Sequence, residues 1–497
     1  VNKLMKPIGS IIYLQILVVF FNYSSQLSAQ NSYNENKEIK QSKLQQDYQI
    51  IHEILQLSHP GLYLYQTPER MAEIFDRYFL EIDNDLTELE FYKLIVPMID
   101  SIHCGHTTAE LSPEFYDNLY SKPLFPFDIE IMDNRIFIKK NWLDNSDLYP
   151  GTEIHSINNC STQQIIDSIS PSISADGYQK CYKLYRMALH FRLHYAKYFN
   201  QTNEYKLSVI KPGGSAEEKV VVQSISWNEL KQKDTLPTPK PLRFEIIDSL
   251  NTGILTIESF SMGYINLFGM NHETFFKEVF REVFLKNIKN LVIDVRGNDG
   301  GNPDVFIPLL KYLMDKPFNV YPKTTIKTQD YPKILFKYSD LPRKYNRKWI
   351  SSFTENQHGE IILKPTAIFI ATLTHQPEDT TFNGKLYILT DAGSYSAASV
   401  VPSFLKSNKK AAIFGEETGG TAAGNTSGIT PTVILPNSKL RINVPLATGY
   451  INASGYSMGR GVNPDFTIIK KLDDLIENKD SQLEFVLKFI HSSKKTN

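Results

Sequence analysis

Two stretches of the chain decide its fold: LVIDVRGNDGG at residues 291–301 and LYILTDAGSYSAAS at residues 386–399. Each begins with a run of apolar residues typical of a buried strand and continues into a glycine-containing turn that opens a helix. Strand ends and helix N-termini are where α/β enzymes gather backbone N–H donors and nucleophiles. The first turn therefore predicts an oxyanion-binding loop, and the second predicts a reactive serine.

Strands and helices alternate on both sides of these stretches, which predicts an α/β core with mostly parallel strands over residues 244–497. The expected strands lie at residues 254–257, 291–295, 368–371 and 386–390. Helices are expected over residues 275–285, after Pro303 and over residues 396–407, with a further helix at the C-terminus.

Three segments precede this core. Residues 30–118 carry apolar side chains at helical spacing, which predicts an N-terminal helical module. Residues 119–226 alternate as strands do, and PGTEIHSINN at 150–159 resembles a PDZ turn, so this segment is expected to be a PDZ-like domain with a helical insertion around 175–200. An ordinary β-rich spacer is the alternative. Residues 227–243 are rich in proline and lysine and predict a linker.

The termini and the charge limit location and partners. Residues 1–29 predict a signal peptide, with a basic start, an apolar stretch and Leu27-Ser28-Ala29 as cleavage site. The mature protein is then expected in the periplasm or outside the cell, without stable membrane insertion; an uncleaved N-terminal membrane anchor is the alternative. The net charge of −1 gives no electrostatic footprint for nucleic acid.

Only three cysteines are present, which excludes a disulfide scaffold and a four-cysteine zinc site. A bridge between Cys160 and Cys181 is allowed, although spacing alone does not establish it. Cys104 lies close to His103 and His106, so a metal site and a thiol nucleophile are both conceivable, but a buried inert thiol is the commoner outcome. We expect no metal and no cofactor.

The two turns resemble the motifs of the tail-specific (C-terminal processing) protease family, which includes the tricorn core and the retinoid-binding-protein repeats. In that family a strand ending Asp-x-Arg-x-Asn-x-Gly-Gly precedes a strand ending Ser-Ala-x-Glu. Residues 294–301 fit the first motif, and Ser396-Ala397-Ala398 fits the second, with Ser399 in place of glutamate. The resemblance implies a protease core of the ClpP/crotonase-like type and makes Ser396 the nucleophile.

A serine at this place has an ordinary alternative role, because capping a helix N-terminus is the usual task of serine there. Joined to the glycine turn, catalysis is the stronger interpretation. The N–H of Ala397 is one expected oxyanion donor, and the N–H of Gly300 or Gly301 is the other, since glycine lets the backbone point an amide at a bound carbonyl.

The family divides by its general base. One branch uses a lysine, but Thr421 stands where the motif Gly-Glu-x-x-x-Gly-Lys requires it. The other branch carries Gly-His-Thr after its N-terminal helices, and Gly105-His106-Thr107 matches. The resemblance therefore implies His106 as general base; a surface histidine is the alternative. The resembling branch has a glutamate just before its Gly-Val-x-Pro-Asp motif. Here the motif is Gly461-Val462-Asn463-Pro464-Asp465, and the stretch 456–460 before it contains no glutamate. Glu416 or Glu417 is therefore the candidate acid to orient the imidazole.

Asp294, Arg296 and Asn298 in the first turn have two possible tasks. Arginine offers a planar fork that suits a peptide carboxylate, so these residues are candidates for substrate binding. A buried network that fixes the oxyanion loop is the preferred interpretation.

The sequence thus predicts a secreted serine-type peptidase acting on peptides or unfolded proteins, of unknown oligomeric state. A family member that lacks catalysis and binds peptides or apolar ligands in the same cleft is the alternative. A serine esterase is a third possibility, disfavoured because no Gly-x-Ser-x-Gly elbow surrounds Ser396.

Overall fold

The computed structural model describes residues 33–144, 146–235, 237–341, 349–367 and 369–494. The signal peptide expected at residues 1–29 lies outside these ranges. None of the helices in them is long and apolar enough to cross a membrane.

The C-terminal half is built on a six-stranded sheet in the order β20-β15-β14-β10-β9-β8. Its strands run parallel except β8, which is antiparallel to β9. All residues of β9 and β10 are buried, which explains their continuous apolar sequence. The α/β prediction is therefore confirmed. The strands of the sheet are β8 (Leu242–Ile247), β9 (Thr252–Ile257), β10 (Asn290–Asp294), β14 (Lys385–Thr390), β15 (Ala411–Gly415) and β20 (Phe466–Thr467).

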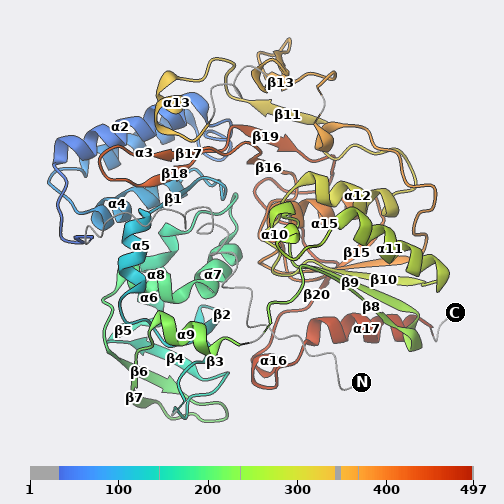
Figure 1. Ribbon diagram of the computed structural model, residues 1–497, viewed down its shortest axis with the longest axis horizontal. Coiled ribbons are helices and arrows are strands. Elements are labelled where there is room, and N and C mark those ends of the chain that lie inside the picture. Colours follow the sequence, from blue (N-terminus) through green and yellow to red (C-terminus); the bar gives the residue numbers. More distant parts are fainter. Residues whose placement is uncertain (1–32, 145, 236, 342–348, 368, 495–497) are drawn as a thin grey trace.

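Helices cover both faces of this sheet and complete a three-layer core (Figure 1). One face carries most of them: α10 (Met262–Leu267), α11 (His272–Leu285), α12 (Pro303–Leu313) and α15 (Ala397–Ser407). The other face is covered by α17 (Ser481–Lys494), which follows the short α16 (Leu472–Ile476).

The turns after β10 and β14 lie side by side because these strands are parallel neighbours, with Asp294 opposite Leu389. Hydrogen bonds join the turns, and one of them runs from the Gly297 N–H to Asp391 Oδ1 at 2.8 Å. The Tyr395 N–H donates to the Asn298 carbonyl at 2.9 Å, and Ser394 Oγ donates to the Val295 carbonyl at 2.9 Å. The sheet thereby brings the two sequence motifs to one edge.

The N-terminal residues form a helical module, coloured blue in Figure 1. Thr67, Thr87 and Ser112 each cap the helix that follows, with a capping box at Thr87. The helices are α2 (Gln41–Ser58), α3 (Pro68–Leu80), α4 (Glu88–Asp100) and α5 (Pro113–Tyr120). Strand β1 (Thr108–Glu110) pairs with β18 (Arg441–Asn443), which pairs with β17 (Thr432–Ile434), so the module is joined to a late segment of the chain.

The segment that follows the helical module in the sequence forms an antiparallel sheet with its own apolar core, at the lower left of Figure 1. Asp133, Asn134, Asn158 and Asn159 have positive φ angles in its tight turns. Its strands are β2 (Phe127–Met132), β3 (Arg135–Asn141), β4 (Glu153–Ile157), β5 (Cys160–Ser161), β6 (Glu204–Ile210) and β7 (Glu218–Gln223). Its helical elements are α6 (Thr162–Ile169), η1 (Ser170–Ser172), α7 (Lys180–Leu189) and α8 (Phe191–Tyr198). Assignment as a PDZ-like domain stays a prediction.

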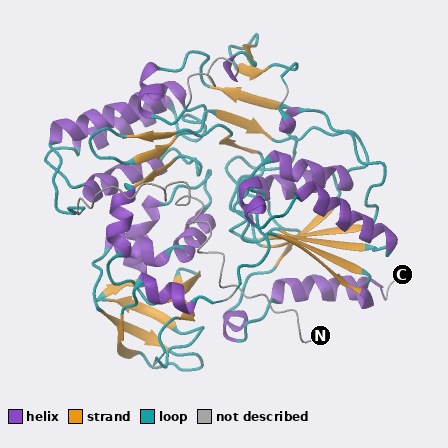
Figure 2. Ribbon diagram, in the orientation of Figure 1, coloured by secondary structure: helices purple, strands orange, loops and turns teal. Residues whose placement is uncertain are grey.

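A five-stranded sheet in the order β12-β13-β11-β19-β16 lies between the helical module and the core, at the top of Figure 1. In Figure 2 its strands are drawn apart from those of the parallel sheet. It consists of β11 (Lys323–Ile326), β12 (Phe353–Glu355), β13 (Ile361–Leu363), β16 (Gly424–Ser427) and β19 (Ala447–Tyr450), and α13 (Lys333–Tyr338) follows β11.

Two local expectations differ from the structure. Residues 369–371 do not form the expected strand, because β14 pairs directly with β10; Ile370–Thr372 instead form the 3₁₀ turn η3, and residue 368 lies outside the described ranges. The expected linker contains α9 (Trp227–Lys233), capped by Ser226 and Glu229 in a capping box and anchored by buried Leu230.

Candidate active site

Ser396 is held in an unusual backbone conformation at the start of α15. Its φ is +53° and its ψ −120°, and its side chain makes no cap hydrogen bond to the helix. The capping role is therefore not the one this serine fills. Instead, its Oγ lies 3.2 Å from His106 Nε2. Such a strained conformation costs roughly 1–3 kcal/mol and is typical of functional sites.

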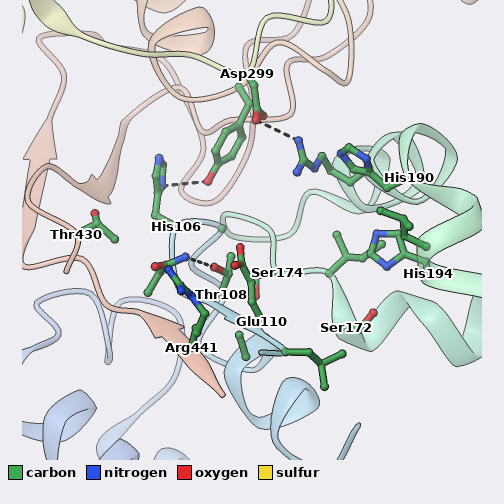
Figure 3. Close-up of a pocket in the computed structure, with 18 of the residues that line it drawn as sticks. His106, Thr108, Glu110, Ser172, Ser174, His190, His194, Asp299, Thr430 and Arg441 are labelled. Atoms are coloured by element: carbon green, nitrogen blue, oxygen red, sulfur yellow. Dashed lines mark hydrogen bonds and ion pairs between the residues drawn. The ribbon is translucent and has the colours of Figure 1, made fainter. Parts of the chain in front are cut away.

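His106 lies in the loop between α4 and β1, 290 residues before Ser396 in the chain. The adjacent Gly105 N–H donates to Asp176 Oδ1 at 2.7 Å, which fixes the loop. A side chain on Gly105 would collide with the Tyr395 hydroxyl, at 2.3 Å from an added Cβ. Both expected members of the catalytic pair thus lie within hydrogen-bonding distance of each other (Figure 3 shows His106).

Two groups face the other ring nitrogen of His106. The Tyr395 hydroxyl lies 3.0 Å from Nδ1, and Asp176 Oδ1 lies 3.9 Å from it. If Nε2 accepts the serine proton, Nδ1 carries a hydrogen and donates it to the tyrosine oxygen. Asp176 is 3% exposed, and its Oδ2 has no hydrogen-bond partner among the described residues. This buried carboxylate supplies negative charge beside the imidazole.

The expectation that Glu416 or Glu417 orients His106 is wrong. Glu416 Oε1 accepts from the backbone N–H of Lys470 and from Gln482 Nε2, each at 3.2 Å. Glu417 Oε1 accepts from Gln179 Nε2 at 2.9 Å and from the Gly461 N–H at 2.8 Å. Both carboxylates therefore tie loops together.

Gly300 and Gly301 are packed where no other residue fits. A Cβ on Gly300 would lie 2.6 Å from Ser396 Cβ and 3.0 Å from Ala397 N, and its φ is +98°. A Cβ on Gly301 would lie 2.0 Å from a Phe260 backbone carbon. The Gly300 N–H already donates to Asn298 Oδ1 at 2.9 Å. The Gly300 N–H is therefore used within the turn itself.

Arg296 links the first turn to the C-terminal segment through hydrogen bonds to two carboxylates. Its Nε and Nη2 donate to the Asp294 carboxylate at 3.0 and 2.9 Å, and Nη1 and Nη2 donate to Asp480 at 2.7 Å each. Burial opposes the charge of Asp480, but the Arg296 hydrogen bond and its positive charge hold the pKa of Asp480 below its ordinary value. Asn298 Nδ2 donates to the Ile257 carbonyl at 2.9 Å. These side chains are hydrogen-bonded within the loop and to the segments next to it.

A cavity of about 690 Å³ opens onto this centre. His106, Gly300, Gly301 and Tyr395 line it, together with residues of the helical module and of α7 and α8 (Figure 3). Tyr182 stacks on Tyr395 with ring centroids 4.3 Å apart, and Asp299 accepts from Arg186 Nη1 at 3.0 Å. The cavity is therefore bounded by all three modules.

All three cysteines are free thiols. Cys104 is buried, and its burial raises its pKa to about 12, so the thiol is inert at neutral pH. Its sulfur, a His106 ring nitrogen and an Asp176 oxygen lie within 4.8 Å of one another, which suits metal ligands by type. The hydrogen-bond distances from the same ring to Ser396 and Tyr395 favour proton transfer as its task.

Sequence reasoning missed Asp176 and Tyr395 as neighbours of the imidazole. Tyr395 precedes the nucleophile directly, so its position in the motif was a usable signal. Asp176 comes from the β-rich module, in a loop before α7, and no local motif marks it.

Fold and site together define a serine-type peptidase. Residues 251–468 match the model of peptidase family S41. No curated protein matches the sequence.

Solved structures extend the likeness over most of the chain. Mature CPAF complexed with lactacystin superposes with a TM-score of 0.67 at 14% identity, covering 92% of this chain and 99% of that one. Another structure of mature CPAF gives a TM-score of 0.63 at 14% identity, covering 88% and 94%. The photosystem II D1 C-terminal processing protease gives 0.43 at 14%, covering 86% and 93%. At these identities the likeness to CPAF shows a shared fold.

Proposed function

We propose that the chain hydrolyses peptide bonds with Ser396 as nucleophile and His106 as general base. The observation that carries the proposal is the 3.2 Å distance between Ser396 Oγ and His106 Nε2, two atoms contributed by different modules. A serine hydroxyl needs such a base, because it is a weak nucleophile until its proton is removed.

The reaction follows from this arrangement. His106 Nε2 takes the proton as Ser396 Oγ attacks the scissile carbonyl, and the N–H groups of Gly301 and Ala397 bind the resulting oxyanion. The imidazolium is stabilised by Tyr395 at Nδ1 and by the charge of Asp176. As the C–N bond breaks, His106 gives its proton to the leaving amine; water then attacks the acyl-serine by the same route.

The substrates are peptides or unfolded proteins, and the place of action is the periplasm or the cell exterior. This part of the proposal rests on the signal-like residues 1–29 and on the family, and it requires no metal, cofactor or nucleic acid.

A fluorophosphonate probe and a mixture of denatured proteins test the proposal on four samples: the unmodified mature protein, Ser396→Ala, His106→Ala and His103→Asn. His103 is the matched control, because it lies three residues away with φ +58°, an angle asparagine tolerates. Its ring is in contact with Tyr65 and Tyr178. We expect labelling and hydrolysis to fall by at least about 10³-fold in the first two variants and to persist in the control.

The alternative is a binding protein without catalysis. Ser399 Oγ donates to the Ser396 carbonyl at 2.8 Å, so the position where the family motif has glutamate serves the backbone of the turn. A folded unmodified protein that binds peptides but takes no probe would establish this alternative and overturn the peptidase.

A further inference from the structure

The cavity has a second end, away from Ser396, whose walls carry basic side chains. His190, His194 and Lys197 line it, and we call these three residues the basic arm; Arg441 lines the cavity on another side, opposite Glu110 in the strand pair of β1 and β18. In Figure 3, His190 and His194 lie on the helical side of the cavity, opposite His106, while Arg441 lies beside Glu110. The arm is continuous, since the rings of His190 and His194 are 6.4 Å apart and the charge of Lys197 acts on both imidazoles.

Lys197 is the unusual member of the arm. It is 6% exposed, and its Nζ donates to the Tyr92 hydroxyl at 3.1 Å. Burial lowers its pKa to about 8, so at neutral pH the ammonium is still charged inside the protein. A buried ammonium is costly unless an anion compensates it.

Three other cations on the same helices form ion pairs with carboxylates. Lys183 pairs with Asp100, Arg186 with Asp299 and Arg192 with Asp128. In the described part of the chain, Lys197 and Arg441 form no ion pair, although Glu110 is close enough to favour the charge of Lys197. The described residues that line the cavity include two acids, Glu110 and Asp299. Asp299 is paired with Arg186, so Glu110 alone faces Lys197 and Arg441, and the lining carries excess positive charge.

The two histidines add neutral donors. Burial, together with the charges of Arg186 and Lys197, holds the pKa of both His190 and His194 well below the usual range. The rings are therefore uncharged at neutral pH, and His194 Nδ1 is buried without a hydrogen-bond partner among the described residues. A neutral imidazole donates one N–H, which suits an incoming oxygen.

We propose that the basic arm binds a carboxylate of the substrate peptide and so selects the bond presented to Ser396. The inference rests on the proposed function, since the arm and the catalytic centre share one cavity. The carboxylate belongs to an aspartate or glutamate side chain or to the chain end. Leu111, Leu193 and Tyr92 also line the cavity and give the carbon atoms next to such a carboxylate an apolar wall.

Matched peptides distinguish a side-chain carboxylate from the C-terminal carboxylate of the substrate. One series replaces glutamate by glutamine at single positions around the scissile bond, and a second compares a free C-terminus with an amide. We expect the unmodified protein to prefer one acidic member by about tenfold or more in kcat/KM, because charge-assisted hydrogen bonds favour the anion over its neutral isostere. The series that shows the preference identifies the source.

Lys197→Met is expected to bring the ratio of acidic to neutral kcat/KM close to one, and Lys197→Arg to restore most of it. The matched control is Lys206→Met, an exposed lysine on β6, which changes net charge equally and should keep the full ratio. Equal hydrolysis of acidic and neutral peptides by the unmodified protein overturns the inference, as does a preference that Lys197→Met leaves intact.

A binding measurement tests the carboxylate site without any need for catalysis. With Ser396→Ala, fluorescence anisotropy of the same labelled peptides should show tighter binding of the acidic member, and adding Lys197→Met should remove that difference. If no peptide is hydrolysed yet this pattern appears, the proposed function fails and the carboxylate site stands. Equal binding of both peptides refutes the site.

Discussion

His106 receives a hydroxyl and a carboxylate on its Nδ1 side. The Tyr395 hydroxyl lies 3.0 Å from His106 Nδ1. Asp176 Oδ1 lies 3.9 Å from the same nitrogen and accepts a hydrogen bond from the Gly105 N–H at 2.7 Å. The tyrosine thus sets the direction of the ring, and the aspartate holds the loop and supplies charge. This division differs from a triad in which one carboxylate performs both tasks.

Separate substitutions should resolve the two contributions. Tyr395→Phe removes one hydrogen bond and should lower kcat by about 3- to 10-fold with KM little changed. Asp176→Asn removes the charge that stabilises the imidazolium and should lower kcat by roughly 10- to 100-fold. Because both act on one ring, the double variant should lose less than the product of the two effects.

Steady-state kinetics on a single peptide, with thermal unfolding of each variant, measure this. Tyr178→Phe is the control, since Tyr178 is half exposed and is in ring contact with His103 and Tyr65. Fully multiplicative losses, or losses confined to KM, would show that the two side chains do not work through His106.

At the scale of elements, the turn between β10 and α12 is set by close approach. Gly300 lies against Ser396 with φ +98°, while its carbonyl accepts from the Phe260 N–H at 2.9 Å. The loop is held on one side by Arg296 and on the other by Tyr395. A displacement of a few tenths of an ångström at Gly300 therefore shifts the backbone around Ser396 and Ala397.

Gly300→Ala should lower the rate of hydrolysis by about 10²-fold or more, because the added methyl group would overlap Ser396. Loss of one oxyanion donor lowers a rate by about this factor. Gly213→Ala is a matched control with φ +76° and no atom within 4 Å of the added Cβ. Both variants carry the cost of a positive φ, but only the first has the clash. Hydrolysis rates and free energies of unfolding of the two proteins check this, and equal activity in both would contradict the assigned role of the turn.

Some secondary-structure elements could be predicted from the sequence, and others could not. Strands β10 and β14 and their turns were predictable, because each apolar run has the length of a buried strand and ends in glycine. The run at residues 368–371 has the same composition, yet the parallel sheet has no place for a strand between β10 and β14. The errors at Glu416 and Glu417 have a similar cause. Position beside a glycine-rich loop does not tell where a carboxylate points, and Asp176 belongs to another module.

At the scale of the whole molecule, the site depends on docking between distant segments. Asp47 on α2 is fully buried, and its carboxylate accepts four hydrogen bonds from Asn437 and Ser438, at 2.6 to 3.2 Å. These two residues form the connection between β17 and β18, and β18 pairs with β1 directly after His106. Asp47 thereby holds the histidine-bearing module against the connection between β17 and β18.

Asp47→Asn should destabilise the protein by about 2–4 kcal/mol, because the amide turns donors toward donors in a buried site. The rate of fluorophosphonate labelling at Ser396 should fall at temperatures where the protein is still folded. Chemical denaturation and labelling kinetics test this against Asp83→Asn, an exposed acid of the same module. Slower unfolding or unchanged labelling in Asp47→Asn would refute the role of this contact.

The separation of 290 residues between His106 and Ser396 has a consequence during biosynthesis. Ribosomes extend a chain at about 5–20 residues per second, so the histidine emerges tens of seconds before the serine. Strand β18 and Asp480, which complete the docking and the Arg296 clamp, follow later still. The contact between Ser396 and His106 and the Arg296 clamp therefore form only after the residues through Asp480 have been synthesised, so a shorter nascent chain lacks the assembled site.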